Sequence, residues 1–246
     1  MKNNHIVSYF AWSIRLIAAV GLAGLLAACE GDSEGSSSSG QRPSRQSSSS
    51  AAASTNATTA SAGSTNVVSP KNAGVILFMG DSVTTGSTVP DAAYPSRIQS
   101  ATGKTVINAA VGGQRSVEGL NRIRGLIDKH RPGTVAIMYG INDIIHGPGV
   151  EGAADNLRKM VRIAKQENCR VLLATIPPRY RGDGIWDTRH TDLNARIRSI
   201  ARGEGARLVD VEREFGQNPD LLQEDGFHPN TDGNRIIGAL FFEALR

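Results

Sequence analysis

Several signatures of other protein classes are missing from this 246-residue sequence. It has no run of lysine and arginine and no basic stretch interleaved with aromatic residues. Residues 71–246 carry 23 Lys and Arg against 20 Asp and Glu, which is only mildly basic. Gly112-Gly113 is not part of a full Gly-x-Gly-x-x-Gly motif, and no acidic residue ends the next strand-like run. These absences disfavour nucleic-acid binding and dinucleotide binding.

The N-terminal segment carries Lys2 and Arg15 and no acidic residue before an apolar stretch, LIAAVGLAGLLAA, at 16–28. A charged start followed by a short apolar stretch is typical of a secretory signal, and thirteen residues are too few for a comfortable membrane span. The stretch ends in LAAC, which resembles the bacterial lipobox, whose cysteine is lipidated. We expect a lipoprotein signal peptide over 1–28, a lipid anchor on Cys29 and a place in the bacterial cell envelope. An ordinary secreted protein and an uncleaved anchor are the alternatives.

Residues 29–70 consist mostly of Ser, Ala, Thr, Gly and Asn. Such a composition buries too little apolar surface to offset ordering entropy, so it predicts a flexible tether. As a random coil this tether would span roughly 35 Å. With Cys29 lipidated, Cys169 has no disulfide partner, and its position at the start of an apolar run indicates a small buried side chain.

Residues 71–246 have the size of one domain, in which five apolar runs of strand length alternate with segments of helical spacing. The runs are rich in Val, Ile and Leu with little alternation, as in strands buried on both faces. They predict an α/β sandwich with a mostly parallel five-stranded sheet and helices on both faces. The runs are 74–80, 105–111, 134–140, 170–176 and 206–211.

Small and polar residues follow each of these runs. In open parallel sheets, ligands bind beyond the carboxyl ends of the strands, so the five segments should converge on one edge. They are Gly80-Asp81-Ser82, 108–115, 139–143, 177–190 and, after a short intervening helix, 225–230.

Those strand ends supply the groups that acyl transfer by serine requires. Ser82 offers a hydroxyl group. Asp225 and His228 lie three residues apart, so the carboxylate can hold one ring nitrogen while the other faces the serine. Gly113 offers a backbone N–H and Asn142 a side-chain amide for a developing oxyanion, with the N–H of Ser82 as a third donor.

Gly80-Asp81-Ser82, Gly113 in NAAVGG, Asn142 in GIND, and Asp225 with His228 in DGFH resemble the four blocks of the SGNH hydrolases, or GDSL family. The order of the blocks matches, and the resemblance covers essentially residues 74–246. It implies a flavodoxin-like three-layer α/β/α fold and ester hydrolysis without metal or cofactor. It also implies a Ser82-His228-Asp225 triad and an oxyanion hole of Ser82, Gly113 and Asn142. Val83 stands where the family name has Leu, a position that varies.

Other residues have less specific interpretations. We expect Asp143 to be structural, His130 to lie at the surface, His146 to face either the cleft or solvent, and His190 to be solvated within the loop 177–190. Ser82 without its partners could be an ordinary turn residue. A Gly-x-Ser-x-Gly elbow is absent, because Thr84 replaces the second glycine.

The substrate is less well specified by the sequence. Envelope location favours an O-acetylated glycan, with lysophospholipid, lipid and thioester substrates as alternatives. A catalytically silent glycan-binding module of the same fold is the non-enzymatic alternative. In the loop 177–190, an aromatic beside arginines could hold a sugar or an anion, or could be a mixed-charge surface; the residues are Arg179, Tyr180, Arg181 and Trp186.

Overall fold

The structure is a computed structural model that describes residues 71–89, 92–180 and 187–246. The predicted signal peptide (1–28) and the tether with Cys29 (29–70) lie outside the described residues, as do residues 181–186 of the loop after the fourth strand. Within the described ranges, no helix combines the length and the apolar character needed to cross a membrane.

Five parallel strands form one sheet with the order β2-β1-β3-β4-β5. This confirms the predicted α/β architecture with a five-stranded parallel sheet. The register pairs Leu77 with Ile107 and Met79 with Ile137. The strands are β1 (Asn72–Gly80), β2 (Thr105–Asn108), β3 (Pro132–Met138), β4 (Arg170–Ala174) and β5 (Arg207–Val209).

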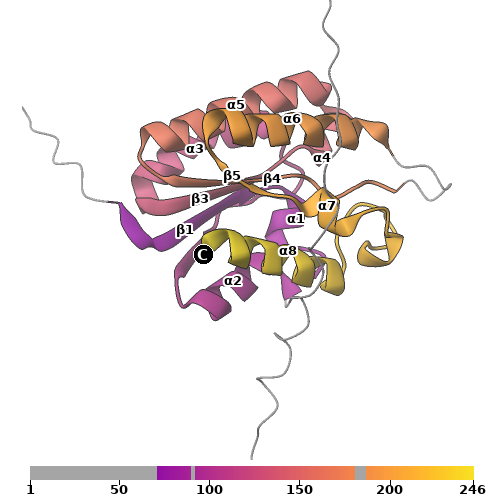
Figure 1. Cartoon of the computed structure of the whole chain (residues 1–246), viewed down its shortest axis with the longest axis horizontal. Helices are drawn as coiled ribbons and strands as arrows, with labels where there is room; N and C mark the ends of the chain where they lie inside the picture. The colour runs from indigo at the N-terminus through magenta and orange to yellow at the C-terminus, as the bar shows by residue number, and fades with distance from the viewer. Residues whose placement is uncertain (1–70, 90–91, 181–186) are drawn as a thin grey trace, which may run out of the picture. The chain divides into compact units, whose positions relative to one another are not determined.

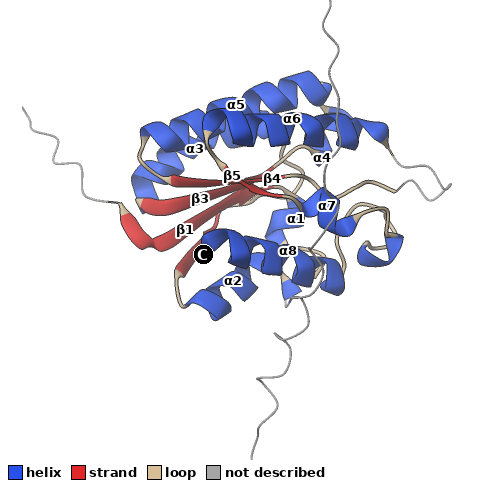
Figure 2. Ribbon diagram, in the orientation of Figure 1, coloured by secondary structure: helices blue, strands red, loops and turns tan. Residues whose placement is uncertain are grey.

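Helices cover both faces of this sheet (Figures 1 and 2). One face packs against α3 (Ser116–His130), α5 (Gly149–Gln166) and α6 (Thr188–Glu204). The other packs against α2 (Tyr94–Thr102) and α8 (Thr231–Leu245). The remaining helices are short and lie near the carboxyl ends of strands; they are α1 (Ser82–Thr85), α4 (Ile141–His146), α7 (Val211–Phe215) and the 3₁₀ turn η2 (Pro219–Leu221).

The central strands are apolar because both of their faces are covered. Residues 76–79 of β1 and 135–138 of β3 are almost completely buried. On the α2–α8 face, Phe78, Tyr94 and Phe241 pack ring against ring, with centroids 5.1 to 5.6 Å apart. The described residues contain a hydrophobic core of their own, which extends from Ile76 to Ala244, and a domain with its own core can fold alone.

The strand order places a topological switch point at β1, because β2 lies on one side of it and β3 on the other. Crevices for ligands form at such points, beyond the carboxyl ends of the strands. Ser82 comes two residues after the end of β1 and therefore lies at the position where this fold binds ligands.

The second strand is shorter than the predicted run 105–111, because β2 ends at Asn108. The chain nevertheless stays beside β1: Ala109 N–H donates to Phe78 C=O at 2.9 Å and Val111 N–H to Gly80 C=O at 3.0 Å. These two bonds carry the glycine-containing segment to the end of β1, next to Ser82.

Candidate active site

Ser82 is the first residue of α1 and lies two residues after Gly80, the last residue of β1. Asp81 caps this helix, since its side chain accepts a hydrogen bond from Val83 N–H at 3.0 Å. The first N–H groups of a helix have no intrahelical acceptor, so the N–H of Ser82 is well placed to donate to a bound group. Burial raises the pKa of the Asp81 carboxyl to about 7.

Gly80, two residues before the serine, has no room for a side chain. A Cβ atom on Gly80 would lie 2.0 Å from Thr84 Oγ1 and 2.8 Å from the carbonyl oxygen of Met138. Thr84 is itself fixed, because its hydroxyl accepts a hydrogen bond from the buried hydroxyl of Tyr94 at 2.9 Å. Close packing of α1 on β1 and β3 therefore requires glycine at position 80 and holds the serine at the sheet edge.

The structure brings Ser82, His228 and Asp225 together. Nε2 of His228 lies 2.7 Å from Oγ of Ser82, and Nδ1 lies 2.6 Å from Oδ2 of Asp225. Oδ1 of Asp225 accepts from the backbone N–H groups of Phe227 (3.1 Å) and His228 (3.0 Å). Burial acts to raise the pKa of Asp225, but these hydrogen bonds outweigh it and lower that pKa below its usual range.

The segment that carries Asp225 and His228 is held at both of its ends. Gln223 N–H donates to the carbonyl oxygen of His228 at 2.8 Å, and Asn230 caps the start of α8 with its side chain. Because these bonds close a tight turn, the imidazole is directed back toward Ser82.

The segment after β4 also braces this turn. Tyr180 N–H donates to Gly226 C=O at 2.7 Å. Gly226 has φ +75°, and a Cβ there would lie 1.9 Å from the carbonyl oxygen of Tyr180, so glycine is required. Tyr180, which the sequence suggested as a substrate contact, thus supports the turn between Asp225 and His228 through its backbone.

Gly113 lies on the loop that follows β2, and Asn142 lies in α4, the short helix that follows β3. A Cβ on the neighbouring Gly112 would be 3.9 Å from the Ser82 Cβ, which places this loop beside the serine. Gly113 has φ +76°, a conformation that glycine adopts without strain. The side-chain amide of Asn142 donates one hydrogen to the carbonyl oxygen of Gln114 at 3.0 Å. An amide group has two N–H hydrogens, so a second donor remains for a ligand.

Asp143, in α4, links that helix to Ser116, the first residue of α3. Its carboxylate accepts from the backbone N–H of Ser116 at 2.9 Å and from the Ser116 hydroxyl at 2.5 Å. Asn156 donates to the same hydroxyl oxygen at 3.0 Å. All of Asp143 is buried, and burial raises its pKa. This linkage agrees with the structural role expected for Asp143; the part played by Ser116 was missed, because nothing in the sequence pairs it with position 143.

The other expected residues lie elsewhere. His146 is exposed at the end of α4. The prediction that His190 is solvated was wrong, because α6 begins at Thr188 and only 5% of His190 is exposed. Cys169 is buried, as expected, and burial raises its pKa. Trp186 and Arg181 lie outside the described residues.

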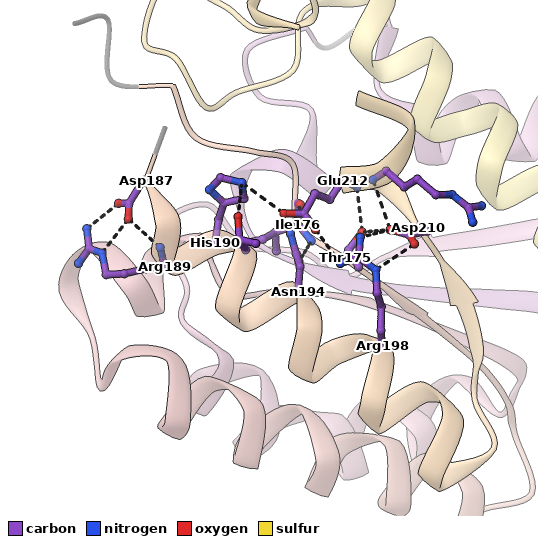
Figure 3. Close-up of polar contacts among 11 residues, drawn as sticks. Thr175, Ile176, Asp187, Arg189, His190, Asn194, Arg198, Asp210 and Glu212 are labelled. Carbon is purple, nitrogen blue, oxygen red and sulfur yellow. Dashed lines mark hydrogen bonds and ion pairs between the residues drawn. The ribbon is translucent and has the colours of Figure 1, made fainter. Parts of the chain in front are cut away.

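His190 belongs to a polar network that joins α6, α7 and the segment after β4 (Figure 3). Its Nε2 lies 3.3 Å from Oε1 of Glu212, and Arg198 pairs with both Glu212 (2.8 Å) and Asp210 (2.6 Å). The backbone N–H of Glu212 donates to the hydroxyl of Thr175 at 2.9 Å. The network connects α6 and α7 to the end of β4. The segment that follows β4 includes Tyr180, which contacts the turn between Asp225 and His228.

A second ion pair closes the base of the loop after β4. Asp187 accepts hydrogen bonds from Arg179 (3.0 Å) and Arg189 (2.6 Å), and these arginines, Arg189 first, lower its pKa. Arg179, suggested from sequence as a substrate contact, is thereby occupied in part by Asp187. In the described part of the chain, no group of three His, Cys, Asp or Glu side chains is arranged to hold a metal ion.

The fold and these groups together define a serine hydrolase of the α/β type. The profile of the "GDSL-like Lipase/Acylhydrolase family" matches residues 78–236. The chain is similar to an arylesterase of Vibrio mimicus, 29% identical over 180 residues that cover 69% of this chain and 87% of the relative. It is also 29% identical over 172 residues to "Thioesterase 1/protease 1/lysophospholipase L1" of Escherichia coli K12, with 67% and 80% covered.

Solved structures agree with the fold. A crystal structure of TesA superposes with a TM-score of 0.62 at 23% identity, covering 70% of this chain and 98% of that one. An acetyl xylan esterase superposes with a TM-score of 0.61 at 22% identity, covering 69% and 98%. The chain belongs to the GDSL-like lipase/acylhydrolase family and is an ester hydrolase, which leaves the silent binding module without support.

Proposed function

We propose that the protein hydrolyses a short-chain carboxylic ester of the cell envelope through an acyl-enzyme on Ser82. The observation that carries the proposal is the continuous hydrogen-bonded chain from Ser82 Oγ through His228 to Asp225, at 2.7 and 2.6 Å. These are the contacts by which a base activates a serine and a carboxylate orients the base.

In the first half-reaction Ser82 Oγ attacks the ester carbonyl carbon while His228 Nε2 takes the hydroxyl proton. Asp225 holds the Nδ1 hydrogen and stabilises the imidazolium that forms. The carbonyl oxygen becomes an oxyanion, which accepts hydrogen bonds from the N–H groups of Ser82 and Gly113 and the amide of Asn142. The bond to the alcohol oxygen then breaks as Nε2–H protonates it, leaving the acyl group on Ser82.

In the second half-reaction water replaces the alcohol. His228 removes a proton from the water as it attacks the acyl carbon, and the proton returns to Ser82 Oγ when that bond breaks. The products are the carboxylic acid and the restored serine.

The surface near the nucleophile favours a small acyl group. Val111 is the one large hydrophobic side chain that is exposed among the described residues, at 41%, and it lies in the loop beside Ser82. Val111 can therefore provide an apolar contact for a small acyl group bound at Ser82. With the predicted lipid anchor at Cys29, an O-acetylated envelope glycan is the substrate class that fits best.

A longer acyl ester or a thioester is the second candidate. It is favoured by the similarity to the Escherichia coli protein whose name includes thioesterase and lysophospholipase. The two candidates differ in acyl length, which a substrate series measures directly.

The test is hydrolysis of p-nitrophenyl esters from acetate to palmitate by residues 71–246. Ser82→Ala should abolish turnover and labelling by a fluorophosphonate. Ser87→Ala, which changes an exposed serine just after α1, should leave both intact. Activity confined to short esters supports the envelope deacetylase, and a preference for long esters supports the second candidate. Turnover retained by a folded Ser82→Ala protein would overturn the mechanism.

The lipid anchor is tested separately. Cells that express the full chain are fed a palmitate analogue, and Cys29→Ser should lose the label. A wild-type protein that is released from cells without label would contradict the anchor and leave the hydrolase mechanism untouched.

A further inference from the structure

A basic residue either begins each strand of the sheet, as in β4 and β5, or directly precedes it, as in β1, β2 and β3. Since the strands are ordered β2-β1-β3-β4-β5, these side chains form a row along the amino end of the sheet. With neighbouring strands about 4.8 Å apart, the row is about 19 Å long. In spatial order it consists of Lys104, Lys71, Arg131, Arg170 and Arg207, and it is called the basic row below.

Three members of the basic row donate hydrogen bonds to backbone carbonyl groups. Lys104 Nζ donates to Ala73 C=O at 3.1 Å. Arg170 binds the carbonyls of Leu245 and Ala244 at the end of α8, at 2.9 and 2.6 Å, and Arg207 binds that of Glu243 at 3.0 Å. A carbonyl group satisfies the hydrogen bond but does not cancel the positive charge. Arg170 and Arg207 are exposed and Lys104 is half-buried, so these three charges are accessible to an anionic surface.

Acidic side chains near the row are already engaged. Glu167 pairs with Lys71 at 3.7 Å and with Arg124 at 3.0 Å. Glu243 pairs through its carboxylate with Arg246 at 2.9 Å. Each of these carboxylates is thus matched by at least one cation, and the positive charge of Lys104, Arg170 and Arg207 remains in excess.

The basic row lies at the opposite end of the sheet from the candidate active site. The nine residues of β1 run from the row to Gly80, a rise of about 30 Å at about 3.3 Å per residue. In Figure 1 the strands start on the side where the C-terminus lies, and α4 and α7 lie at their far ends. A surface that contacts the basic row therefore leaves Ser82 facing away from it.

We propose that the basic row is a docking face for a membrane of anionic phospholipids, which holds the domain with its catalytic edge directed away from the lipid. The inference rests on the proposed envelope anchor at Cys29. The predicted tether joins the domain at Lys71, within the row itself, so lipidation at Cys29 would keep this end near the headgroups. Tethering through a flexible linker raises the local concentration of the domain at the membrane, and so strengthens the electrostatic contact that the basic row makes by itself.

The same residues also stabilise the fold, because cations near helix C-termini are favourable. This stabilising role depends on the hydrogen bonds to the carbonyl groups and does not depend on the lipid composition of a membrane. Docking depends on charge alone. Replacing arginine by lysine keeps the charge but alters the two-point contact with the carbonyls, so it separates the two roles.

The experiment is co-sedimentation of residues 71–246 with vesicles of phosphatidylcholine containing increasing phosphatidylglycerol, at low and at 0.5 M salt. The loss-of-charge variant is Lys104→Gln/Arg170→Gln/Arg207→Gln, and the charge-keeping variant is Arg170→Lys/Arg207→Lys. A matched variant removes three positive charges elsewhere: Lys159→Gln/Arg196→Gln/Arg235→Gln. Circular dichroism confirms that each protein is folded, and hydrolysis of a soluble ester is measured on the same samples.

The wild type should bind anionic vesicles and lose binding at high salt. Loss of charge in the row should weaken binding by about tenfold or more, and the lysine variant and the matched variant should bind nearly as well as wild type. Equal binding by the loss-of-charge variant, equal weakening by the matched variant, or no binding by the wild type would each overturn the proposal. Ester hydrolysis that persists in every folded variant shows that such a failure concerns the docking face and not the hydrolase.

Discussion

The carboxylate of Asp143 holds both the backbone N–H and the hydroxyl group of Ser116, at 2.9 and 2.5 Å, across the interface of α3 and α4. The contact fixes the loop of Gly113 relative to the helix of Asn142, although neither Ser116 nor Asp143 is placed to touch the substrate. The two predicted oxyanion donors therefore depend on a buried contact that positions them.

Ser116→Ala should lower kcat about ten- to a hundredfold with little change in KM, because the donors shift relative to the oxyanion. It should also destabilise the fold by about 1–3 kcal/mol, since a buried carboxylate oxygen loses its partner. Steady-state kinetics and urea unfolding measure the two effects. Ser100→Ala, which removes an exposed hydroxyl on α2, is the control. If Ser116→Ala loses stability but keeps its kcat, the contact does not position the donors.

Gly113→Ala tests the oxyanion loop with a control of the same backbone geometry. Gly113 (φ +76°) and Gly103 (φ +66°) both adopt a left-handed conformation, and a Cβ on either would meet no atom within 4 Å. Alanine at each position should therefore destabilise by a similar amount, about 1–2 kcal/mol. Turnover should fall only in Gly113→Ala, and an equal loss of turnover in Gly103→Ala would show that strain alone explains the effect.

Asn142→Ala should reduce kcat about 10²- to 10³-fold while the protein still reacts with a fluorophosphonate, because one oxyanion donor is removed and the triad remains. The test is to measure both kcat and the yield of fluorophosphonate labelling for Asn142→Ala and for wild type. A loss below threefold would remove Asn142 from the proposed oxyanion hole.

The raised pKa of Asp81 predicts that the free energy of unfolding depends on pH. Burial raises its pKa from 3.8 to about 7, so the folded state binds this proton more tightly than the unfolded state does. The contribution is fully present below about pH 4 and is lost as the pH rises through 7; three pKa units correspond to about 4 kcal/mol. Asp81→Asn should therefore melt higher than wild type at pH 8, and the difference should shrink as the pH falls and vanish below about pH 4. Parallel melting curves across this range would refute the assignment.

The lowered pKa of Asp225 predicts the opposite pH dependence of stability. Its pKa is lowered in the folded state, so its contribution is present above the unfolded value and is lost as the pH falls through the folded value, below pH 4. More than a third of its side chain is exposed, so solvent screening keeps the effect small. Asp225→Asn should flatten the acid limb of the melting curve and lower kcat strongly at neutral pH, because the imidazole loses its orienting carboxylate.

The sequence determined the fold class and predicted which polar residues meet at one edge of the sheet. Apolar runs without alternation require strands covered on both faces, and their alternation with helical spacing leads to a parallel sheet. Polar residues after each run must then meet at one edge, which is why Ser82 and His228, 146 positions apart, could be paired before any distance was known.

Only the tertiary structure shows which side chains that are far apart in the sequence contact each other. The burial of His190 depends on α6 starting at Thr188 and packing on Glu212, whereas the sequence around it reads as a polar loop. The contact between Ser116 and Asp143 and the basic row likewise join residues that are neighbours only once the strand order is set. Side-chain periodicity reports which face of an element is buried, but the identity of the neighbour on that face is fixed by the packing of the whole chain.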